Sequence, residues 1–113
     1  MAIKVELLGG LDLLFNKQKA LSLSLSNLGS TKLGSLIDYM AQIIEKPSQK
    51  DLFILNGTVR PGIIVLVNDQ DWELLEKEEY NLEEGDEVVF VSTLHGKTIF
   101  SIFFIIFKTN CIN

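Results

Sequence analysis

The sequence VRPGIIVLVNDQDWELL, residues 59–75, contains the clearest strand of the chain, with a turn before it and a turn after it. Ile63–Val67 is a continuous run rich in β-branched residues, typical of a strand covered on both faces. Pro61 fixes φ and Gly62 permits a sharp turn into this strand. Residues 68–71 then lead to Trp72–Leu75, which we expect to be a second short strand or extended piece. Trp72 is expected to be an anchor in the core or at the sheet edge.

Two further strands precede this block. Ile3, Val5 and Leu7 alternate with charged residues, which predicts a half-buried strand ending at Gly9-Gly10. Residues 21–26 alternate leucine and serine without a fault, so we expect a second strand with its leucines facing inward. Because turn residues join the two strands closely in sequence, an antiparallel pair is the simplest topology.

Residues 31–46 change from a strand period to a helix period. Ser30 or Thr31 is expected to cap the helix, and Pro47 prevents it from continuing beyond Lys46. The expected core face consists of apolar residues at i, i+3, i+4 spacing, namely Leu33, Leu36, Ile37, Met40, Ile43 and Ile44.

The rest of the chain up to residue 92 supplies the last strands. A short apolar piece, 51–55, ends at the strong turn pair Asn56-Gly57, and a glutamate-rich segment, 76–87, has Tyr80 and Leu82 as its expected anchors. The closing strand is 87–92. A mixed sheet of four to five strands packed on one main helix is a two-layer α+β fold. If the first and last strands are neighbours, the peptide after Ser92 leaves from the middle of the sheet.

Length and charge limit the possible functions. At 113 residues and net charge −5, the chain supports one acidic domain. Residues 69–87 hold ten acidic residues against one base, Lys77. Such a stretch repels phosphate backbones, so no direct nucleic-acid binding is expected. It suits either a basic protein partner or a solvated surface that keeps the domain soluble, and both interpretations stay open.

The residues also provide no enzyme site. His95 is the only histidine and Cys111 the only cysteine, so the sequence lacks a disulfide framework, a cysteine-ligated metal site and a nucleophile–base pair at a recognisable spacing. No signal peptide is visible. We therefore expect a cytoplasmic protein without a bound cofactor or metal, which acts as a substrate or partner of enzymes rather than as an enzyme.

Two segments carry a resemblance to a known family. Residues 59–75 and residues 89–96, VFVSTLHG, resemble the central block and the closing strand with terminal peptide of the ubiquitin-related modifiers, which are eukaryotic sulfur carriers and protein modifiers. With the two opening strands and the helix in the expected order, the resemblance covers residues 1–96. It implies a β-grasp, ubiquitin-like fold.

The resemblance also implies a chemistry and a set of partners. An E1-like enzyme would adenylate the C-terminal glycine with ATP, and a persulfide on that enzyme or its rhodanese domain would convert the product to a thiocarboxylate. Sulfur would then pass, through a tRNA thiolase complex, to wobble uridines, and the modifier could also be attached to lysines of target proteins. Gly96 would be the activated residue. Thr93, Leu94 and His95 would be recognised by the activating enzyme, or would be an ordinary frayed strand end.

One departure from the family concerns the end of the domain. The family ends in a pair of glycines, whereas Gly96 is followed by Lys97 and sixteen further residues. We interpret 1–96 as the carrier domain and 97–113 as an apolar extension. The form as written is expected to be inactive, because adenylation requires a free glycine carboxylate.

Three explanations of residues 97–113 compete. The apolar run Thr98–Phe107 has ten residues, too few for a membrane anchor, which needs about 17–25, so no membrane partner is expected. Removal of a precursor extension after Gly96 would leave a single glycine. We favour a translated intron or mis-spliced end, because Gly96-Lys97 can be encoded by GGT-AAG, which contains a common splice-donor sequence.

Two other functions remain open. The main alternative is a non-conjugating ubiquitin-like domain that binds proteins through its sheet and never uses its end. A prokaryote-type carrier serving molybdopterin or thiamine synthesis is a further alternative, and the 59–75 block argues against it.

We predict that the mature transcript is spliced within the Gly96-Lys97 codons and supplies a second glycine and a stop. Sequencing the transcript across codons 95–98 tests this. Abundant, uninterrupted message encoding residues 97–113 would contradict it.

Overall fold

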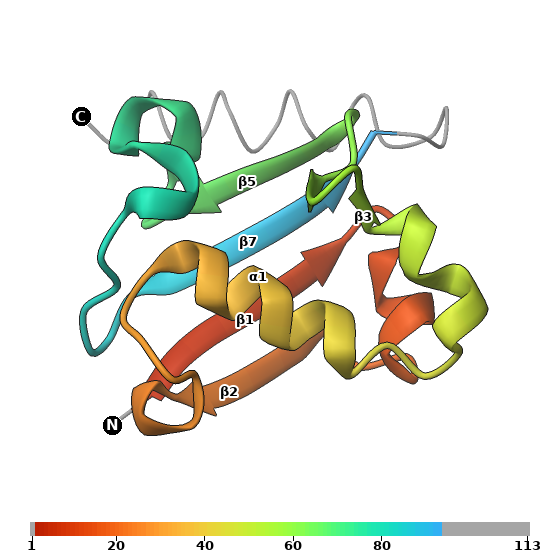
Figure 1. The fold of residues 1–113 in the computed structure, drawn as a ribbon, viewed down its shortest axis with the longest axis horizontal. Coiled ribbons are helices and arrows are strands. Elements are labelled where there is room, and N and C mark those ends of the chain that lie inside the picture. Colours follow the sequence, from red (N-terminus) through yellow and green to blue (C-terminus); the bar gives the residue numbers. More distant parts are fainter. Residues whose placement is uncertain (1, 94–113) are drawn as a thin grey trace.

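The computed structural model of the chain describes residues 2–93, which form a five-stranded mixed sheet with one α-helix packed across it (Figure 1). The strands lie in the order β2-β1-β7-β5-β6. Their bounds are Ala2–Leu8 (β1), Ala20–Ser24 (β2), Ile63–Val67 (β5), Gln70–Asp71 (β6) and Glu87–Ser92 (β7). The helix, α1, is Leu33–Gln42. The predicted α+β class, with four to five strands on one main helix, is confirmed.

Short elements complete the described chain. A small two-stranded sheet pairs β3, Ile54–Leu55, with β4, Thr58–Val59, through Asn56 and Gly57, whose positive φ angles give the turn predicted from this pair. Five 3-10 helices connect the larger elements, namely Leu11–Phe15 (η1), Leu25–Asn27 (η2), Pro47–Leu52 (η3), Trp72–Leu75 (η4) and Lys77–Glu79 (η5).

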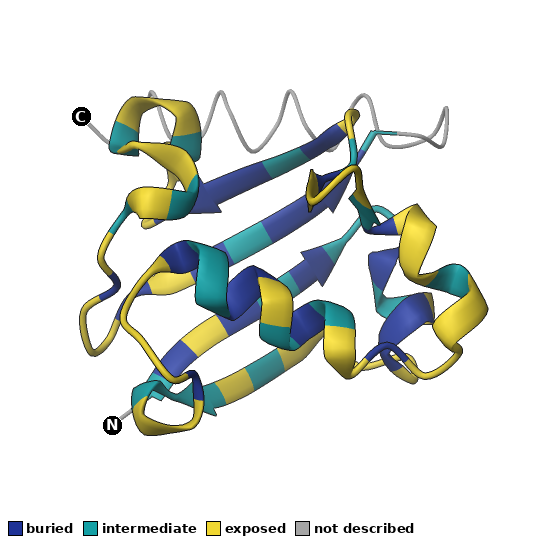
Figure 2. Cartoon of the chain, in the orientation of Figure 1, coloured by how far each residue is buried: buried dark blue, intermediate teal, exposed yellow. Residues whose placement is uncertain are grey.

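The core lies between the sheet and α1, and the buried stretches of the strands and of the helix are coloured dark blue in Figure 2. The pairing register places Phe90 of β7 between Leu7 of β1 and Val65 of β5. Phe90 also packs edge-on against Phe53, with ring centroids 5.3 Å apart, and Phe53 packs in the same way against Phe15 at 5.5 Å. Within residues 2–93, the buried residues of this cluster lie between positions 3 and 90.

The start of α1 differs from the prediction. Lys32 is the N-cap residue and makes no side-chain capping bond, so Ser30 and Thr31 are not the caps. A distant segment occupies this end of the helix instead. The Leu33 amide donates to the Tyr80 carbonyl at 2.8 Å, and the Leu82 amide donates to the Thr31 carbonyl at 2.6 Å. Tertiary hydrogen bonds therefore satisfy groups that a local cap would otherwise have to satisfy.

Two further elements, the helix and the second strand, end earlier than predicted. The helix stops at Gln42, so Ile43 falls outside it and is 38% exposed, although Ile44 is buried as expected. The second strand stops at Ser24, because Leu25 begins a 3-10 turn. Leu21, Leu23 and Leu25 nevertheless pack against the core, so the inward orientation of the leucines is confirmed.

The segment Trp72–Leu75 is a 3-10 helix rather than a strand. The Asp71 carboxylate accepts a hydrogen bond from the Glu73 amide at 2.9 Å, an N-cap interaction that starts a helical turn at this point. Trp72 packs against the core, as expected of an anchor.

Three of the ten acidic residues in the stretch 69–87 form ion pairs within the described part of the chain. Glu73 pairs with Lys77 at 3.7 Å, Glu79 with Lys32 at 3.1 Å and Glu87 with Lys4 at 3.9 Å, all at the surface. Exposed pairs of this kind contribute little stability each. Their presence nevertheless favours the interpretation of the stretch as a solvated surface over that of a dedicated binding site.

Asp86 is the buried member of this stretch, and it ties the glutamate-rich segment to the sheet. Its side chain accepts hydrogen bonds from Asn68 Nδ2 at 2.9 Å, the Tyr80 hydroxyl at 3.1 Å and the Glu83 amide at 2.9 Å. A buried carboxylate needs such donors to offset its lost hydration. Burial, and then the charge of Asp86, raise the pKa of Tyr80 above its ordinary value.

We predict that Tyr80→Phe destabilises the domain by about 1.5–3 kcal/mol at neutral pH, because it removes one hydrogen bond from a charged, buried acceptor. Since folding raises the pKa of Tyr80, the stabilising effect of this hydroxyl is fully present below the ordinary tyrosine pKa of about 10. It is lost as the pH rises from there through the higher pKa of the folded state. Urea unfolding of both proteins across this range should show the difference narrowing. A constant difference at all pH values would contradict the assignment.

Candidate functional site

The candidate site is the carboxyl end of β7, from which the terminal peptide leaves the domain. β7 lies between β1, to which it is parallel, and β5, to which it is antiparallel (Figure 1). The last pair on the β5 side is Ile63 with Ser92. The first and last described strands are therefore neighbours, as expected, and β7 ends inside the sheet rather than at its edge.

Thr93, the last described residue, is held by the turn that precedes β5. Its amide donates to the Gly62 carbonyl at 2.8 Å, and its hydroxyl donates to the same oxygen. The turn has the form expected from its sequence, with Pro61 at the second position, Gly62 at φ 99° and the Ile63 amide bonded to the Arg60 carbonyl at 3.1 Å. These bonds fix where the terminal peptide begins.

Gly9 holds the same point from the β1 side. A Cβ atom on Gly9 would lie 2.4 Å from the Ser92 carbonyl oxygen and 3.0 Å from its amide nitrogen, and Gly9 has φ +71°. Only glycine combines that backbone conformation with so close an approach. The sequence indicated a turn at Gly9-Gly10, but it gave no sign of the contact with Ser92.

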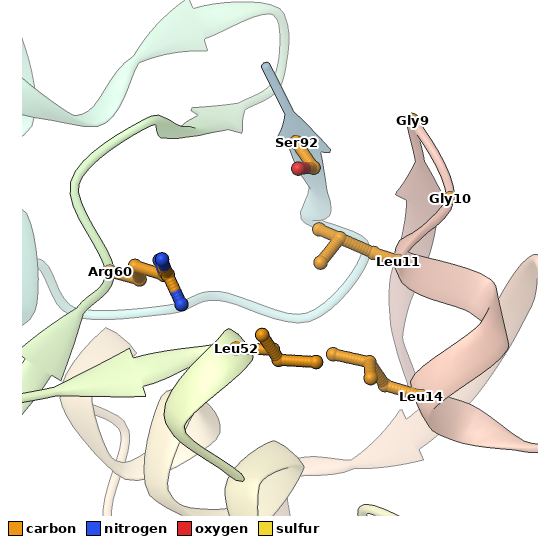
Figure 3. A pocket seen from close by; sticks show the side chains of 7 residues that line it. All are labelled: Gly9, Gly10, Leu11, Leu14, Leu52, Arg60 and Ser92. Atoms are coloured by element: carbon orange, nitrogen blue, oxygen red, sulfur yellow. The ribbon is translucent and has the colours of Figure 1, made fainter. Parts of the chain in front are cut away.

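A pocket of about 270 Å³ adjoins this point (Figure 3). Gly9, Gly10 and Ser92 line one part of it, and Leu11 and Leu14 of η1, Leu52 of η3 and Arg60 line the rest. Sequence reasoning did not bring these residues together, because they come from four separate segments.

Of the predicted site residues, the structure describes Thr93 alone. Leu94, His95 and Gly96, together with the extension 97–113, lie outside the described residues. The amide and the hydroxyl of Thr93 both donate to the Gly62 carbonyl, so this residue anchors the peptide. Its recognition by an activating enzyme stays a prediction.

Within residues 2–93, no three His, Cys, Asp or Glu side chains are grouped in a way that could hold a metal ion. The same residues include no helix with the length and apolar character needed to cross a membrane.

The sheet therefore has β7 at its centre, and the turn before β5 holds the residue that follows β7. A clear family match accompanies this fold. A family model described as Urm1 (Ubiquitin related modifier) matches residues 2–97. The chain belongs to the Urm1 family.

Known proteins agree with this assignment. Ubiquitin-related modifier 1 of Vanderwaltozyma polyspora is 48% identical over 99 residues, which cover 83% of this chain and 96% of the yeast protein. The solution structure of Urm1 from Trypanosoma brucei is similar with a TM-score of 0.67 and 41% identity, covering 84% of this chain and 94% of that one. CysO, in the Amycolatopsis orientalis BexX/CysO complex, shares the fold at a TM-score of 0.67, with 18% identity over 84% of this chain and 99% of the matched chain.

The resemblance and the β-grasp fold inferred from residues 59–75 and 89–96 are thereby confirmed. The Urm1 family consists of ubiquitin-like modifiers and sulfur carriers, which are small carrier proteins rather than catalysts.

We predict that Gly9→Ala destabilises the domain more than Gly29→Ala does. Both glycines have positive φ, which costs an alanine about 1–2 kcal/mol, but a Cβ on Gly29 meets nothing within 4 Å. The alanine at position 9 must in addition displace the Ser92 backbone. Urea unfolding of the two variants measures the difference, and equal losses would contradict the proposed contact.

Proposed function

We propose that this Urm1-family chain carries sulfur on the carboxylate of Gly96, or of a glycine that directly follows it, once that residue is the C terminus. An E1-like enzyme with adenylyltransferase and rhodanese sulfurtransferase activities activates the carboxylate with ATP. The sulfur then serves 2-thiolation of tRNA wobble uridines through a tRNA thiolase complex. In a second use, the activated carboxylate is joined to lysines of target proteins. The chain itself binds no cofactor and works in the cytoplasm.

The observation that supports this proposal most strongly is the anchoring of Thr93. Gly62 bonds to Thr93 on one side and Gly9 packs against Ser92 on the other, so the terminal peptide begins at a fixed point. Gly96 lies three positions after Thr93, which is an extended reach of about 10 Å. A short peptide from a rigid origin suits delivery of a carboxylate into an enzyme, because little chain entropy remains to be lost on binding.

The chemistry requires a carboxylate and a narrow chain, and both are properties of a terminal glycine. A carboxylate oxygen attacks the α-phosphorus of ATP and pyrophosphate leaves. A persulfide sulfur of the enzyme then attacks the acyl carbon and AMP leaves, which forms an acyl disulfide. A cysteine thiol of the enzyme attacks the enzyme-side sulfur and releases the thiocarboxylate. Glycine suits the first step because it has no side chain to obstruct a channel next to ATP.

Lys97 and the residues after it bear directly on this proposal. A peptide bond to Lys97 converts the Gly96 carboxylate into an amide, which cannot attack ATP as a carboxylate does. We therefore treat the chain with residues 97–113 attached as the inactive form. The active form would arise from a transcript that ends in a second glycine.

CysO, whose fold this chain shares, was solved in complex with a second protein, BexX. That case supports a protein partner for the present domain. Under the alternative function, a non-conjugating interaction domain, a partner would also bind, but the terminal carboxylate would have no role. The two functions therefore differ in what happens to the C terminus.

The test uses a variant with Lys97→Gly and a stop codon directly after position 97, which keeps every core residue that the structure describes. We predict that incubation with the cognate activating enzyme, ATP and a sulfur donor raises its intact mass by the replacement of one oxygen with sulfur. The matched control carries Lys97→Gly but retains residues 98–113, and its mass should not change.

A mass shift in both proteins would contradict the need for a free carboxylate. The absence of a shift in the truncated variant, with an enzyme that is active on another carrier and a variant whose urea unfolding shows a folded domain, would favour the interaction domain.

A further inference from the structure

The pocket beside the exit of β7 has apolar walls and a charged rim. Leu11 and Leu14 are buried in its floor, whereas Leu52 is 43% exposed. In Figure 3 the side chains of Leu14 and Leu52 point toward one another, and Leu11 and Arg60 face the same space from opposite sides. This space suits an apolar side chain of a partner, which would bury the exposed part of Leu52.

The Arg60 guanidinium keeps N–H donors available at the edge of the pocket. Its Nη1 donates to the Asp51 carbonyl at 3.2 Å, and within residues 2–93 the guanidinium forms no ion pair with a carboxylate. A guanidinium carries five N–H donors in a fixed plane, which matches a carboxylate well. The ligand that fits therefore combines an apolar side chain with a carboxylate close to it. A protein surface can present an apolar side chain and a carboxylate side by side, so the ligand that fits is a protein.

The position of the pocket identifies which protein would reach it. Ser92 lines the pocket, and Gly96 is four residues further along, so the activated carboxylate lies within about 14 Å of Ser92 at full extension. An enzyme that encloses the end of the peptide must cover this end of the domain. A phosphate or nucleotide would leave the leucine walls exposed to water, so the pocket is not suited to bind ATP.

We propose that this pocket is a docking site for the activating enzyme, which inserts an apolar side chain between Leu11, Leu14 and Leu52 and pairs a carboxylate with Arg60. The inference rests on the proposed function and adds a second contact region to the terminal peptide. It assigns roles to Leu52 and Arg60 in recognition of the enzyme and none in the chemical step.

The experiment measures ATP–pyrophosphate exchange by the activating enzyme as a function of carrier concentration, with the Lys97→Gly chain that ends at position 97 as the parent. We expect Leu52→Asp and Arg60→Ala each to raise the KM for the carrier about tenfold, as loss of a central interface contact does, and to leave kcat unchanged. Leu52→Met should restore most of the parental KM.

Two matched controls lie away from the pocket. Leu74→Asp makes the same exchange at a leucine that is 78% exposed on η4, and Lys19→Ala removes one positive charge beside β2. Both should keep the parental KM. Urea unfolding of every variant confirms that the domain is folded, and neither Leu52 nor Arg60 belongs to the buried core.

The outcomes separate the two proposals. If the parent supports no exchange, the proposed function fails and the docking site fails with it. If the parent is active and Leu52→Asp has the same KM as Leu74→Asp, the docking site alone is overturned. It is also overturned if Leu52→Asp abolishes self-association in sedimentation. The docking site is overturned as well if the methyl NMR signals of Leu52 respond to removal of residues 98–113 and not to added enzyme, because residues 98–113 would then be the occupant of the pocket.

Discussion

The parallel pairing of β1 with β7 is the interaction on which the rest of this structure depends. It joins the first and last described segments of the chain, with Val5 beside Val88 and Leu7 beside Phe90. Without it, the sheet would divide into a β1–β2 hairpin and a separate β7–β5–β6 unit. Phe90 would also lose Leu7, its neighbour on the β1 side. One strand thus completes the sheet, fills the centre of the core and sets the direction of the terminal peptide.

Features whose cause is local could be predicted from the sequence. The alternation of Ile3, Val5 and Leu7, the apolar run Ile63–Val67 and the turn pairs Asn56-Gly57 and Pro61-Gly62 each contain their own explanation, and each is found as expected. The central position of β7 could be predicted from the inferred fold, in which the first and last strands are neighbours. The family resemblance then connected that position with a terminal glycine.

Features whose cause lies in distant residues could not be predicted. The start of α1 is stabilised by the backbone around Tyr80 and Leu82, some fifty positions away, so the serine and threonine before the helix were misleading. The turn at residues 68–71 suggested an extended Trp72–Leu75, but the Asp71 carboxylate accepts a hydrogen bond from the Glu73 amide and starts a 3-10 turn. The contact of Gly9 with Ser92 and the pocket between η1, η3 and Arg60 exist only in the folded chain.

The central position of β7 has a consequence for the order in which the domain folds. A chain made from its N terminus receives β7 after every other described element, and pairing between segments distant in sequence is slow to form. The fold cannot close before residues 87–92 are in place, and Thr93 cannot reach Gly62 until then. A truncated or misfolded copy therefore lacks the fixed origin of its terminal peptide. Completion of the sheet and fixing of the point where the terminal peptide begins are therefore a single event in folding.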